Sequence, residues 1–419
     1  MRNLIFIAIT IGLFSCSAQK QEGKVENVTA LTEVFGSGQK TTAAILEYNT
    51  TIKNETLKKD LFSVNGRIIT KVYANDTARK SDKGKDGKFV IIELSPNDEN
   101  SATFIPNGKD SKIIKAAVTV TQLKSVEATD GNTINSWETT MSNGNKIINL
   151  VVDDFTKQEF HDPATGITVK YNLFIPKNYD RHKSYPMVMF IHDAGVVSTE
   201  IRATLMQGLG AVIWASPEEQ AKHEAFVLAP QFSVVTVNDK SEYTQDLDAT
   251  VNLIHKLTQQ YSIDTKRLYT TGQSMGCMSS IVLNFKYPDL FAASYLVAGQ
   301  WDPAVVSPLA KDNLWIVVSQ GDDKAFPGMN AITAALEKKG AKICRETLNG
   351  RSTAEEFNQA VNKVLAKRCK INYTPLQAGT VVPPEMAGKG GADHRATWLI
   401  AYKIEGIRDW LFAQKKMAL

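Results

Sequence analysis

The sequence has little of what metal-binding and nucleic-acid-binding proteins require. Its 419 residues include only six histidines and four cysteines, and none of these falls in the CxxC or histidine-rich spacings that hold metal ions. The formal net charge is only +4, and the basic residues form no helix or aromatic-rich stripe that would suit nucleic acid. We therefore expect no metal, no cofactor and no nucleic-acid partner.

The sequence also lacks an apolar run long enough to cross a membrane. The apolar segment near its start, Leu4–Phe14, follows Arg2 and is shorter than the roughly 20 residues that a membrane-spanning helix needs. A positive charge before a short apolar run is typical of a signal peptide. The run ends in Leu13-Phe14-Ser15-Cys16, which resembles a bacterial lipobox, where the cysteine is acylated and becomes the first mature residue.

This resemblance gives three expectations for the start of the chain. Residues 1–16 would be a lipoprotein signal peptide up to the lipobox Cys16, and residues 17–23 would be a tether. The protein would be an exported bacterial lipoprotein, periplasmic or on the cell surface, anchored to the membrane through the lipid on Cys16 alone. The alternative is an ordinary signal peptide that is cut near Ala18.

Three cysteines remain if Cys16 carries the lipid. An exported protein meets oxidising surroundings, so Cys344 and Cys369 can form a disulfide if the fold brings them together. Cys277 follows a serine-containing motif described below. We expect Cys277 to be a small core residue and not a nucleophile.

Residues 24–155 alternate apolar and polar side chains in short segments, a pattern typical of strands. Clear examples are 43–48 and 89–94, and turn clusters such as Gly36-Ser37-Gly38 separate the segments. Regularly spaced short strands with few helical segments predict a β-sandwich. This part of the sequence has no group of nucleophile, base and acid, so we expect a spacer, binding or packing module.

Residues 156–419 show a different pattern, in which continuous apolar strands alternate with amphipathic helices. The predicted strands are 167–176 at an edge, 185–191, 225–230, 267–271, 292–298 and 314–318, and the predicted helices include 246–261, 329–339 and 396–412. This alternation predicts a mostly parallel sheet covered by helices on both faces. Active-site residues of such sheets lie at the carboxyl ends of the strands.

The motif Gly272-Gln273-Ser274-Met275-Gly276 follows one of these strands and precedes a helix-like run that ends near Pro288. A strand, Gly-x-Ser-x-Gly and a helix together are the context of a nucleophile elbow. Its tight turn exposes the serine hydroxyl, and the start of the helix directs backbone N–H groups toward the space above it. We predict that Ser274 is a nucleophile.

A serine nucleophile needs a histidine base, and the base needs an acid that orients it. In proteins with this elbow the chain order is serine, acid, histidine. His394 is the only histidine after Ser274, in a glycine-rich loop before the last predicted helix. Two aspartates, Asp322 and Asp323, follow the strand that ends at residue 318. Asp323 stands four residues before Pro327, a common spacing after this strand, so we predict Asp323 as the acid and keep Asp322 as the alternative.

The oxyanion formed during attack on a carbonyl group needs two N–H donors. We predict the backbone N–H of Met275, directly after the nucleophile, and that of Ala194, in the loop after the strand 185–191. The small residues of the segment His192-Asp193-Ala194-Gly195 let the backbone come close to a substrate. His192 precedes the nucleophile in the chain, so we expect it to shape the loop and not to act as the base.

These motifs together resemble a known family. Residues 160–419 resemble α/β-hydrolase esterases related to polyhydroxybutyrate depolymerases, feruloyl esterases and proteins called predicted peptidases. Residues 24–150 resemble the immunoglobulin-like domain that precedes the hydrolase domain in two-domain carboxylesterases of this group. The matching segments of the hydrolase part are Phe190-Ile191-His192-Asp193-Ala194-Gly195, Phe226-Val227-Leu228-Ala229-Pro230-Gln231, Gly272-Gln273-Ser274-Met275-Gly276, and His394 with Trp398 and Asp409-Trp410-Leu411-Phe412.

The resemblance implies an immunoglobulin-like β-sandwich at 24–155 followed by an α/β-hydrolase domain at 156–419. It also implies a serine carboxylesterase that uses Ser274, Asp323 and His394 and forms an acyl-enzyme. The expected substrates are small esters or acylated polysaccharides with short-chain, acetyl or feruloyl groups.

Two segments depart from the family pattern. Asp193 replaces the first glycine of the usual His-Gly-x-Gly in the oxyanion loop, and Ser319-Gln320 replaces the usual His-Gly at the start of the acid loop. Two other functions are compatible with the same residues. A serine peptidase would use the same three side chains, and a lipid-tethered binding protein would carry an inert hydrolase domain. The presence of nucleophile, acid and base in the right order argues against the inert protein.

Overall fold

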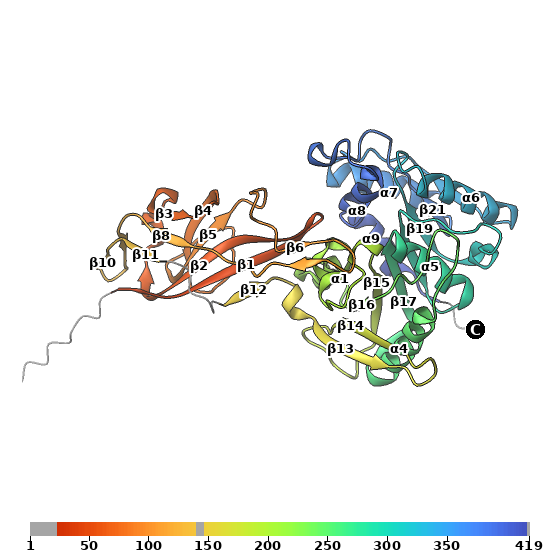
Figure 1. Ribbon diagram of the computed structural model, residues 1–419, viewed down its shortest axis with the longest axis horizontal. Helices are drawn as coiled ribbons and strands as arrows, with labels where there is room; N and C mark the ends of the chain where they lie inside the picture. Colours follow the sequence, from red (N-terminus) through yellow and green to blue (C-terminus); the bar gives the residue numbers. More distant parts are fainter. Residues whose placement is uncertain (1–22, 140–145, 417–419) are drawn as a thin grey trace, which may run out of the picture.

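The structure is a computed structural model that describes residues 23–139 and 146–416. The predicted signal peptide, lipidation site Cys16 and most of the tether lie outside these residues. Within the described ranges, none of the helices has the length and hydropathy needed to cross a membrane. The chain forms two domains that lie side by side (Figure 1).

The N-terminal domain is built from strands. Its strands are β1 (Val25–Phe35), β2 (Gly38–Ile52), β3 (Phe62–Val64), β4 (Ile69–Asn75), β5 (Gly87–Leu94), β6 (Phe104–Ile105), β7 (Lys112–Ile113), β8 (Val120–Gln122), β9 (Val126–Glu127), β10 (Thr133–Ile134), β11 (Trp137–Thr139) and β12 (Ile147–Asn149). A five-stranded sheet has the order β12-β1-β2-β5-β4, and a three-stranded sheet has the order β11-β8-β3. Leu46 and Ile92 of the first sheet share one core with Phe62 and Val120 of the second, which makes a sandwich.

The second domain contains one nine-stranded sheet with the order β13-β14-β16-β15-β17-β18-β19-β21-β20. The strands are β13 (Thr156–His161), β14 (Thr168–Phe174), β15 (Tyr185–Ile191), β16 (Phe226–Gln231), β17 (Ile263–Gln273), β18 (Ala293–Val297), β19 (Leu314–Val317), β20 (Ile343–Arg345) and β21 (Ile371–Tyr373). From β16 to β20 in this order, each strand pairs in parallel with its neighbour. The strand β14 pairs antiparallel with both of its neighbours, β13 and β16.

Helices cover both faces of this sheet. The helices are α1 (Ala203–Met206), α2 (Leu209–Val212), α3 (Pro217–Lys222), α4 (Asp246–Gln260), α5 (Met275–Lys286), α6 (Ala325–Lys338), α7 (Ala354–Ala366), α8 (Ala392–Ala401) and α9 (Glu405–Ala413). Along β15, Met187 and Met189 point into a core shared with α4, α5 and α6. Val188 and Phe190 point into the opposite core, shared with α2, α7, α8 and α9. The predicted fold class, a mostly parallel sheet covered on both faces, is confirmed.

Two details of the predicted pattern are wrong. The predicted edge strand is β14, which lies inside the sheet, and the edge is formed by β13, a polar segment whose side chains are mostly exposed. The predicted helix 396–412 is two helices, α8 and α9, that are separated at residues 402–404. The buried Arg408 guanidinium donates a hydrogen bond of 2.7 Å to the carbonyl group of Tyr402, which the break leaves free.

The cysteines in the described part of the chain are one disulfide pair and one buried free thiol. Cys344 in β20 and Cys369 before β21 form a disulfide with a Cα–Cα distance of 5.7 Å. This bond closes the segment that carries α7 and so ties the outermost strand of the sheet to its neighbour. Cys277 is fully buried in α5, and burial raises the pKa of its thiol, so it is a core residue and not a nucleophile.

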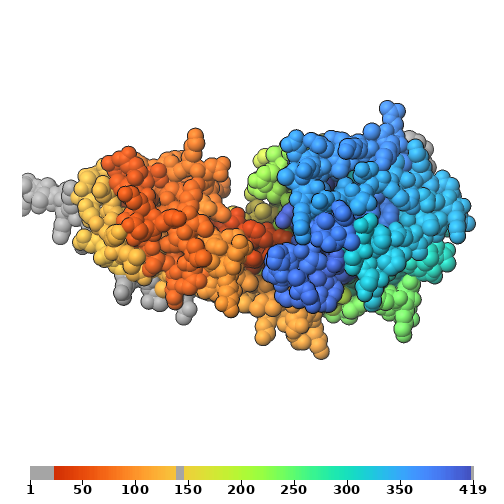
Figure 2. Space-filling model, turned by 90° about the horizontal axis from the view of Figure 1, so that it is seen from above, coloured from red at the N-terminus to blue at the C-terminus, as the bar shows by residue number. Residues whose placement is uncertain are grey.

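The N-terminal domain contacts the second domain through two of its turns. The β1–β2 turn places the carbonyl group of Gly36 against Gly208, where an added Cβ atom would lie 3.0 Å from the carbonyl oxygen. The β6–β7 hairpin lies beside α1 (Figure 1), and in Figure 2 orange atoms, from the part of the chain near residue 100, extend along the second domain.

Candidate active site

The motif around Ser274 forms the sharp turn that the sequence predicts. Ser274 links β17 to α5 with φ of 53° and ψ of −118°, a conformation that is rare for residues other than glycine. The two glycines of the motif serve close packing. A Cβ atom on Gly276 would lie 1.9 Å from the Ile191 carbonyl oxygen, and one on Gly272 would lie 2.4 Å from the Gly276 backbone. The strained residue is therefore the serine itself, which is held by glycines that no larger residue can replace.

His394 lies within hydrogen-bond distance of Ser274, as the sequence predicts. Its Nε2 atom is 2.9 Å from Ser274 Oγ, and its Nδ1 atom is 2.5 Å from Asp322 Oδ2. Since a carboxylate only accepts, Nδ1 carries the proton and Nε2 is free to accept the serine proton. The helix α8 begins directly after Gly391, which has a left-handed backbone conformation, and His394 lies in the first turn of this helix. His394 is therefore not in the predicted loop before a helix.

The predicted acid, Asp323, is wrong, and the alternative Asp322 takes the position beside His394. Asp322 is buried, whereas the neighbouring Asp323 is exposed at the rim of the site. Asp322 also accepts hydrogen bonds at Oδ1 from the backbone N–H groups of Lys324 and Ala325, at 3.1 and 2.9 Å. The same carboxylate thus holds the histidine with one oxygen and the start of α6 with the other.

Asp322 remains ionised despite its burial. Burial alone would raise its pKa, but the hydrogen bond from His394 and those from the backbone N–H groups of Ala325 and Lys324 hold the pKa below the usual range of an aspartate. An ionised carboxylate at this position fixes the imidazole tautomer and stabilises an imidazolium ion.

Ser319 connects the acid loop to the helix that carries His394. Its hydroxyl group donates a hydrogen bond of 2.7 Å to Asp393 Oδ1, in the residue before the histidine. Its backbone N–H donates to Thr397 Oγ1, one turn further along α8. The side-chain contact is made by the serine that stands in place of the histidine of the usual His-Gly at the start of the acid loop. It could not be found from the sequence, because residues 319 and 393 are far apart and neither belongs to a motif.

The loop after β15 is fixed on its buried side by His192, which is fully buried. Its Nε2 accepts a hydrogen bond from the Phe232 N–H at 3.0 Å, and its Nδ1 donates to the Asp193 carbonyl oxygen at 2.8 Å. Burial lowers the pKa of His192 and keeps the ring neutral. His192 therefore shapes the loop, as predicted, and both of its ring nitrogens are bound to backbone groups.

Asp193 connects the same loop to the elbow. Its Oδ2 accepts a hydrogen bond of 2.8 Å from Gln273, the residue before Ser274, and its Oδ1 accepts one from the Gly195 N–H. The aspartate that departs from the family glycine is thus a bridge between the two halves of the site.

The two predicted oxyanion donors line the same cavity as Ser274 and His394. Ala194 begins a 3-10 turn at Ala194–Val196, and Met275 begins α5. The first N–H groups of a helical turn have no acceptor within that turn, so both are available to a ligand. Their position is compatible with the predicted role, and the role itself stays a prediction.

The cavity above Ser274 has a volume of about 540 Å³. Apolar side chains of Val235, Val237 and Met278 form part of its wall. At its rim Lys324 forms an ion pair of 2.9 Å with Asp239, and both side chains are exposed. The cavity therefore combines apolar side chains with an exposed, charged pair in its lining.

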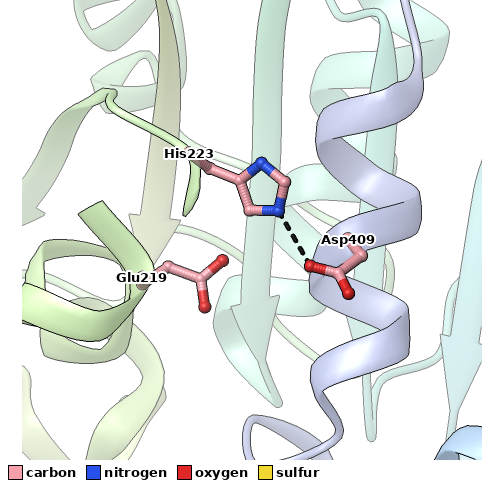
Figure 3. A group of neighbouring side chains, drawn as sticks. All are labelled: Glu219, His223 and Asp409. Atoms are coloured by element: carbon pink, nitrogen blue, oxygen red, sulfur yellow. Dashed lines mark hydrogen bonds and ion pairs between the residues drawn. The ribbon is translucent and has the colours of Figure 1, made fainter. Parts of the chain in front are cut away.

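One group in the described part of the chain has side chains of the kinds that hold metal ions. Ligand atoms of Glu219, His223 and Asp409 lie within 4.8 Å of one another (Figure 3). His223 Nε2 is 2.8 Å from Asp409 Oδ1, and Glu219 Oε2 accepts a hydrogen bond of 2.7 Å from the Arg408 guanidinium, which leaves Glu219 Oε1 unpaired among the described residues. A cation bound here would displace the contact between His223 and Asp409 and would lie beside the positive charge of the Arg408 guanidinium. We assign the group to holding α9 against α3.

Comparison with known proteins agrees with this architecture. Residues 27–135 match the family described as "Esterase Ig-like N-terminal domain", and residues 163–358 match the Esterase family, described as "Putative esterase". A solved thermostable esterase is 29% identical, with a TM-score of 0.79 over 94% of this chain and 100% of that protein. The chain thus has an esterase-type immunoglobulin-like domain over residues 27–135 and an esterase domain over residues 163–358. The predicted class, a carboxylic ester hydrolase with an α/β-hydrolase fold, is confirmed.

More distant relatives share only part of this esterase. The Probable acetylxylan esterase A of Aspergillus flavus is 34% identical over 64 residues, which are 15% of this chain and 21% of the relative. The esterase thus aligns with about a fifth of that curated relative. A solved feruloyl esterase module from Clostridium thermocellum is 13% identical, with a TM-score of 0.42 over 63% of this chain and 90% of that module.

We predict that the two neighbouring aspartates respond differently to the same substitution. Asp322→Asn should lower kcat for ester hydrolysis by about 10³- to 10⁴-fold, because an amide cannot stabilise the imidazolium ion or fix its tautomer. Asp323→Asn should leave kcat within about twofold of the wild type, because its side chain is exposed and His394 is held by Asp322. Steady-state kinetics on a short-chain nitrophenyl ester measure both. A larger loss in Asp323→Asn would contradict the assignment.

Proposed function

We propose that this esterase is a serine carboxylesterase that works through an acyl-enzyme intermediate. The observation that carries the proposal is the hydrogen-bonded series Ser274–His394–Asp322 at the floor of an open cavity. Geometry of this kind turns a weak nucleophile into a reactive one, because the base is in contact with the hydroxyl and is itself oriented.

In the acylation step, Ser274 Oγ attacks the carbonyl carbon of the ester while its proton passes to His394 Nε2. The carbonyl oxygen becomes negative and receives hydrogen bonds from the N–H groups of Ala194 and Met275. The tetrahedral intermediate then breaks the bond to the alcohol oxygen, which leaves with the proton from His394. Asp322 stays ionised throughout and stabilises the imidazolium ion.

In the deacylation step, a water molecule takes the place of the alcohol. His394 Nε2 removes a proton from this water as its oxygen attacks the acyl carbon. The second tetrahedral intermediate uses the same two N–H donors and collapses to release the carboxylic acid, while the proton returns to Ser274 Oγ.

We propose a small acyl group on a polar alcohol as the substrate. The apolar wall of Val235, Val237 and Met278 suits an acyl chain, and the polar rim of Asp239, Gln300 and Lys324 suits the hydroxyl groups of a carbohydrate. The short match to the probable acetylxylan esterase agrees with an acetyl ester of a polysaccharide. Feruloyl esters are the second candidate, on the sequence resemblance alone.

We predict that Ser274→Ala abolishes ester hydrolysis, with kcat lower by about 10⁵- to 10⁶-fold, since the bond-forming oxygen is lost. The wild type should hydrolyse acetylated xylan and short-chain nitrophenyl esters, and should leave peptides uncut. Measuring released acetate, ferulate and new peptide termini in parallel separates the three activities. Peptide cleavage without ester cleavage would support the peptidase alternative. Retained ester hydrolysis in Ser274→Ala would refute the mechanism.

We also propose that the protein is an exported lipoprotein held at the membrane through Cys16. The lipobox-like Leu13-Phe14-Ser15-Cys16 after a short apolar run supports this proposal. A lipobox cysteine carries two acyl chains. Two chains anchor a protein stably in a membrane, whereas a single chain binds only weakly.

Membrane attachment should depend on the cysteine at position 16. A labelled fatty acid supplied to bacteria that make the full chain should appear in the wild-type protein and not in Cys16→Ser, which should leave the membrane fraction. The Cys277→Ser variant is the control and should be labelled as the wild type is, because that thiol is buried in the core. An unlabelled wild type would show that the segment is an ordinary signal peptide.

A further inference from the structure

The β6–β7 hairpin of the N-terminal domain makes a direct contact with the loop that carries Ala194. The backbone N–H of Gly108, at the tip of the hairpin, donates a hydrogen bond of 2.7 Å to the carbonyl oxygen of Gly195. Gly195 follows Ala194 in the same 3-10 turn. A hydrogen bond between the two domains therefore reaches within one residue of a proposed oxyanion donor.

The hairpin tip is built to present this N–H group. The Ser111 hydroxyl donates to the Gly108 carbonyl oxygen at 2.6 Å and accepts from the Asn107 N–H at 2.9 Å. Gly108 has a φ of 54°, in the left-handed region that glycine enters without strain. The tip is thus fixed by its own hydrogen bonds before it meets the second domain, and little conformational freedom is lost in making the contact.

An apolar contact seats the base of the hairpin. Phe104 is 3% exposed and packs against Val196, Ala203 and Met206 of the second domain. Val196 belongs to the same 3-10 turn as Ala194, and the other two residues lie in α1. The neighbouring Ile105 points the opposite way along the strand and is 46% exposed. Only one face of the hairpin therefore serves the contact.

The loop is fixed on its buried side by the second domain itself. His192 binds the Phe232 N–H, and the buried Gln231 donates a hydrogen bond of 2.8 Å to the Val196 carbonyl oxygen. Ala194 and Gly195, by contrast, are the exposed part of the loop. Stabilisation of a developing oxyanion depends on donors that are already in place, so movement of this exposed part would weaken it.

We propose that the β6–β7 hairpin is a positioning element of the active site, through which the N-terminal domain holds the oxyanion loop in its working conformation. The inference rests on the proposed function in one respect, the use of the Ala194 N–H as a donor. It gives the N-terminal domain a part in turnover, which goes beyond the spacer, binding or packing module expected from the sequence.

The test replaces residues 106–111 by Asn-Gly. This dipeptide forms a two-residue turn that keeps β6 paired with β7 and removes Gly108. The β1–β2 turn still contacts Gly208, so the domains stay together. A second variant, Phe104→Ala, removes the apolar contact, and Ile105→Ala on the opposite face is its matched control. Kinetics on a nitrophenyl ester, the rate of Ser274 phosphonylation by a nitrophenyl phosphonate, and circular dichroism are measured for each.

We expect the shortened hairpin and Phe104→Ala to lower kcat by about 10-fold, which is less than the roughly 10²- to 10³-fold loss that follows removal of a whole oxyanion donor. KM should change little, phosphonylation should slow in parallel, and Ile105→Ala should match the wild type. The inference would be overturned if the variant with the shortened hairpin kept the kcat of the wild type. It would also be overturned if the loss of kcat in that variant were no larger than the fraction of unfolded protein that circular dichroism detects. If the wild type cleaved no ester, the proposed function would fail, and the phosphonylation rates would still decide the role of the hairpin.

Discussion

The site depends on one imidazole ring that is held from both sides. His394 accepts from Ser274 at Nε2 and donates to Asp322 at Nδ1, and these three residues come from the start of α8, the β17–α5 turn and the loop before α6. Neither contact is local in the chain, so the ring is placed only when the sheet has assembled. The ionised state of the buried Asp322 in turn depends on the proton that His394 donates to it.

Much of the surrounding structure keeps these elements in register. Ser319 binds Asp393 and so fixes the acid loop against α8, and Asp193 binds Gln273 and so fixes the oxyanion loop against the elbow. Both residues stand where the family pattern expected from the sequence has other residues, and both bind across the site in this chain. The Gly108–Gly195 hydrogen bond adds a third support that comes from the other domain.

The sequence predicted the parts of the site that local patterns determine. Ser274 lies in a motif whose glycines are required because a Cβ atom on either would lie 2.4 Å or less from the neighbouring backbone. His394 follows from chain order, as the one histidine after Ser274. The choice of Asp323 over Asp322 was wrong, because the spacing to Pro327 does not show which of two adjacent side chains is buried beside His394. The polar edge strand β13 and the break between α8 and α9 depend on tertiary partners, Arg408 among them, that no sequence period reveals.

A crystal structure of the esterase after reaction with a nitrophenyl phosphonate tests the central claim most directly. The phosphonyl group imitates the tetrahedral intermediate, with one oxygen in the place of the oxyanion. The account predicts a bond from Ser274 Oγ to phosphorus, a phosphonyl oxygen about 2.7–3.1 Å from the N–H groups of both Ala194 and Met275, and His394 still paired with Asp322. A phosphonyl group on another residue, or an oxygen that points away from both N–H groups, would contradict it.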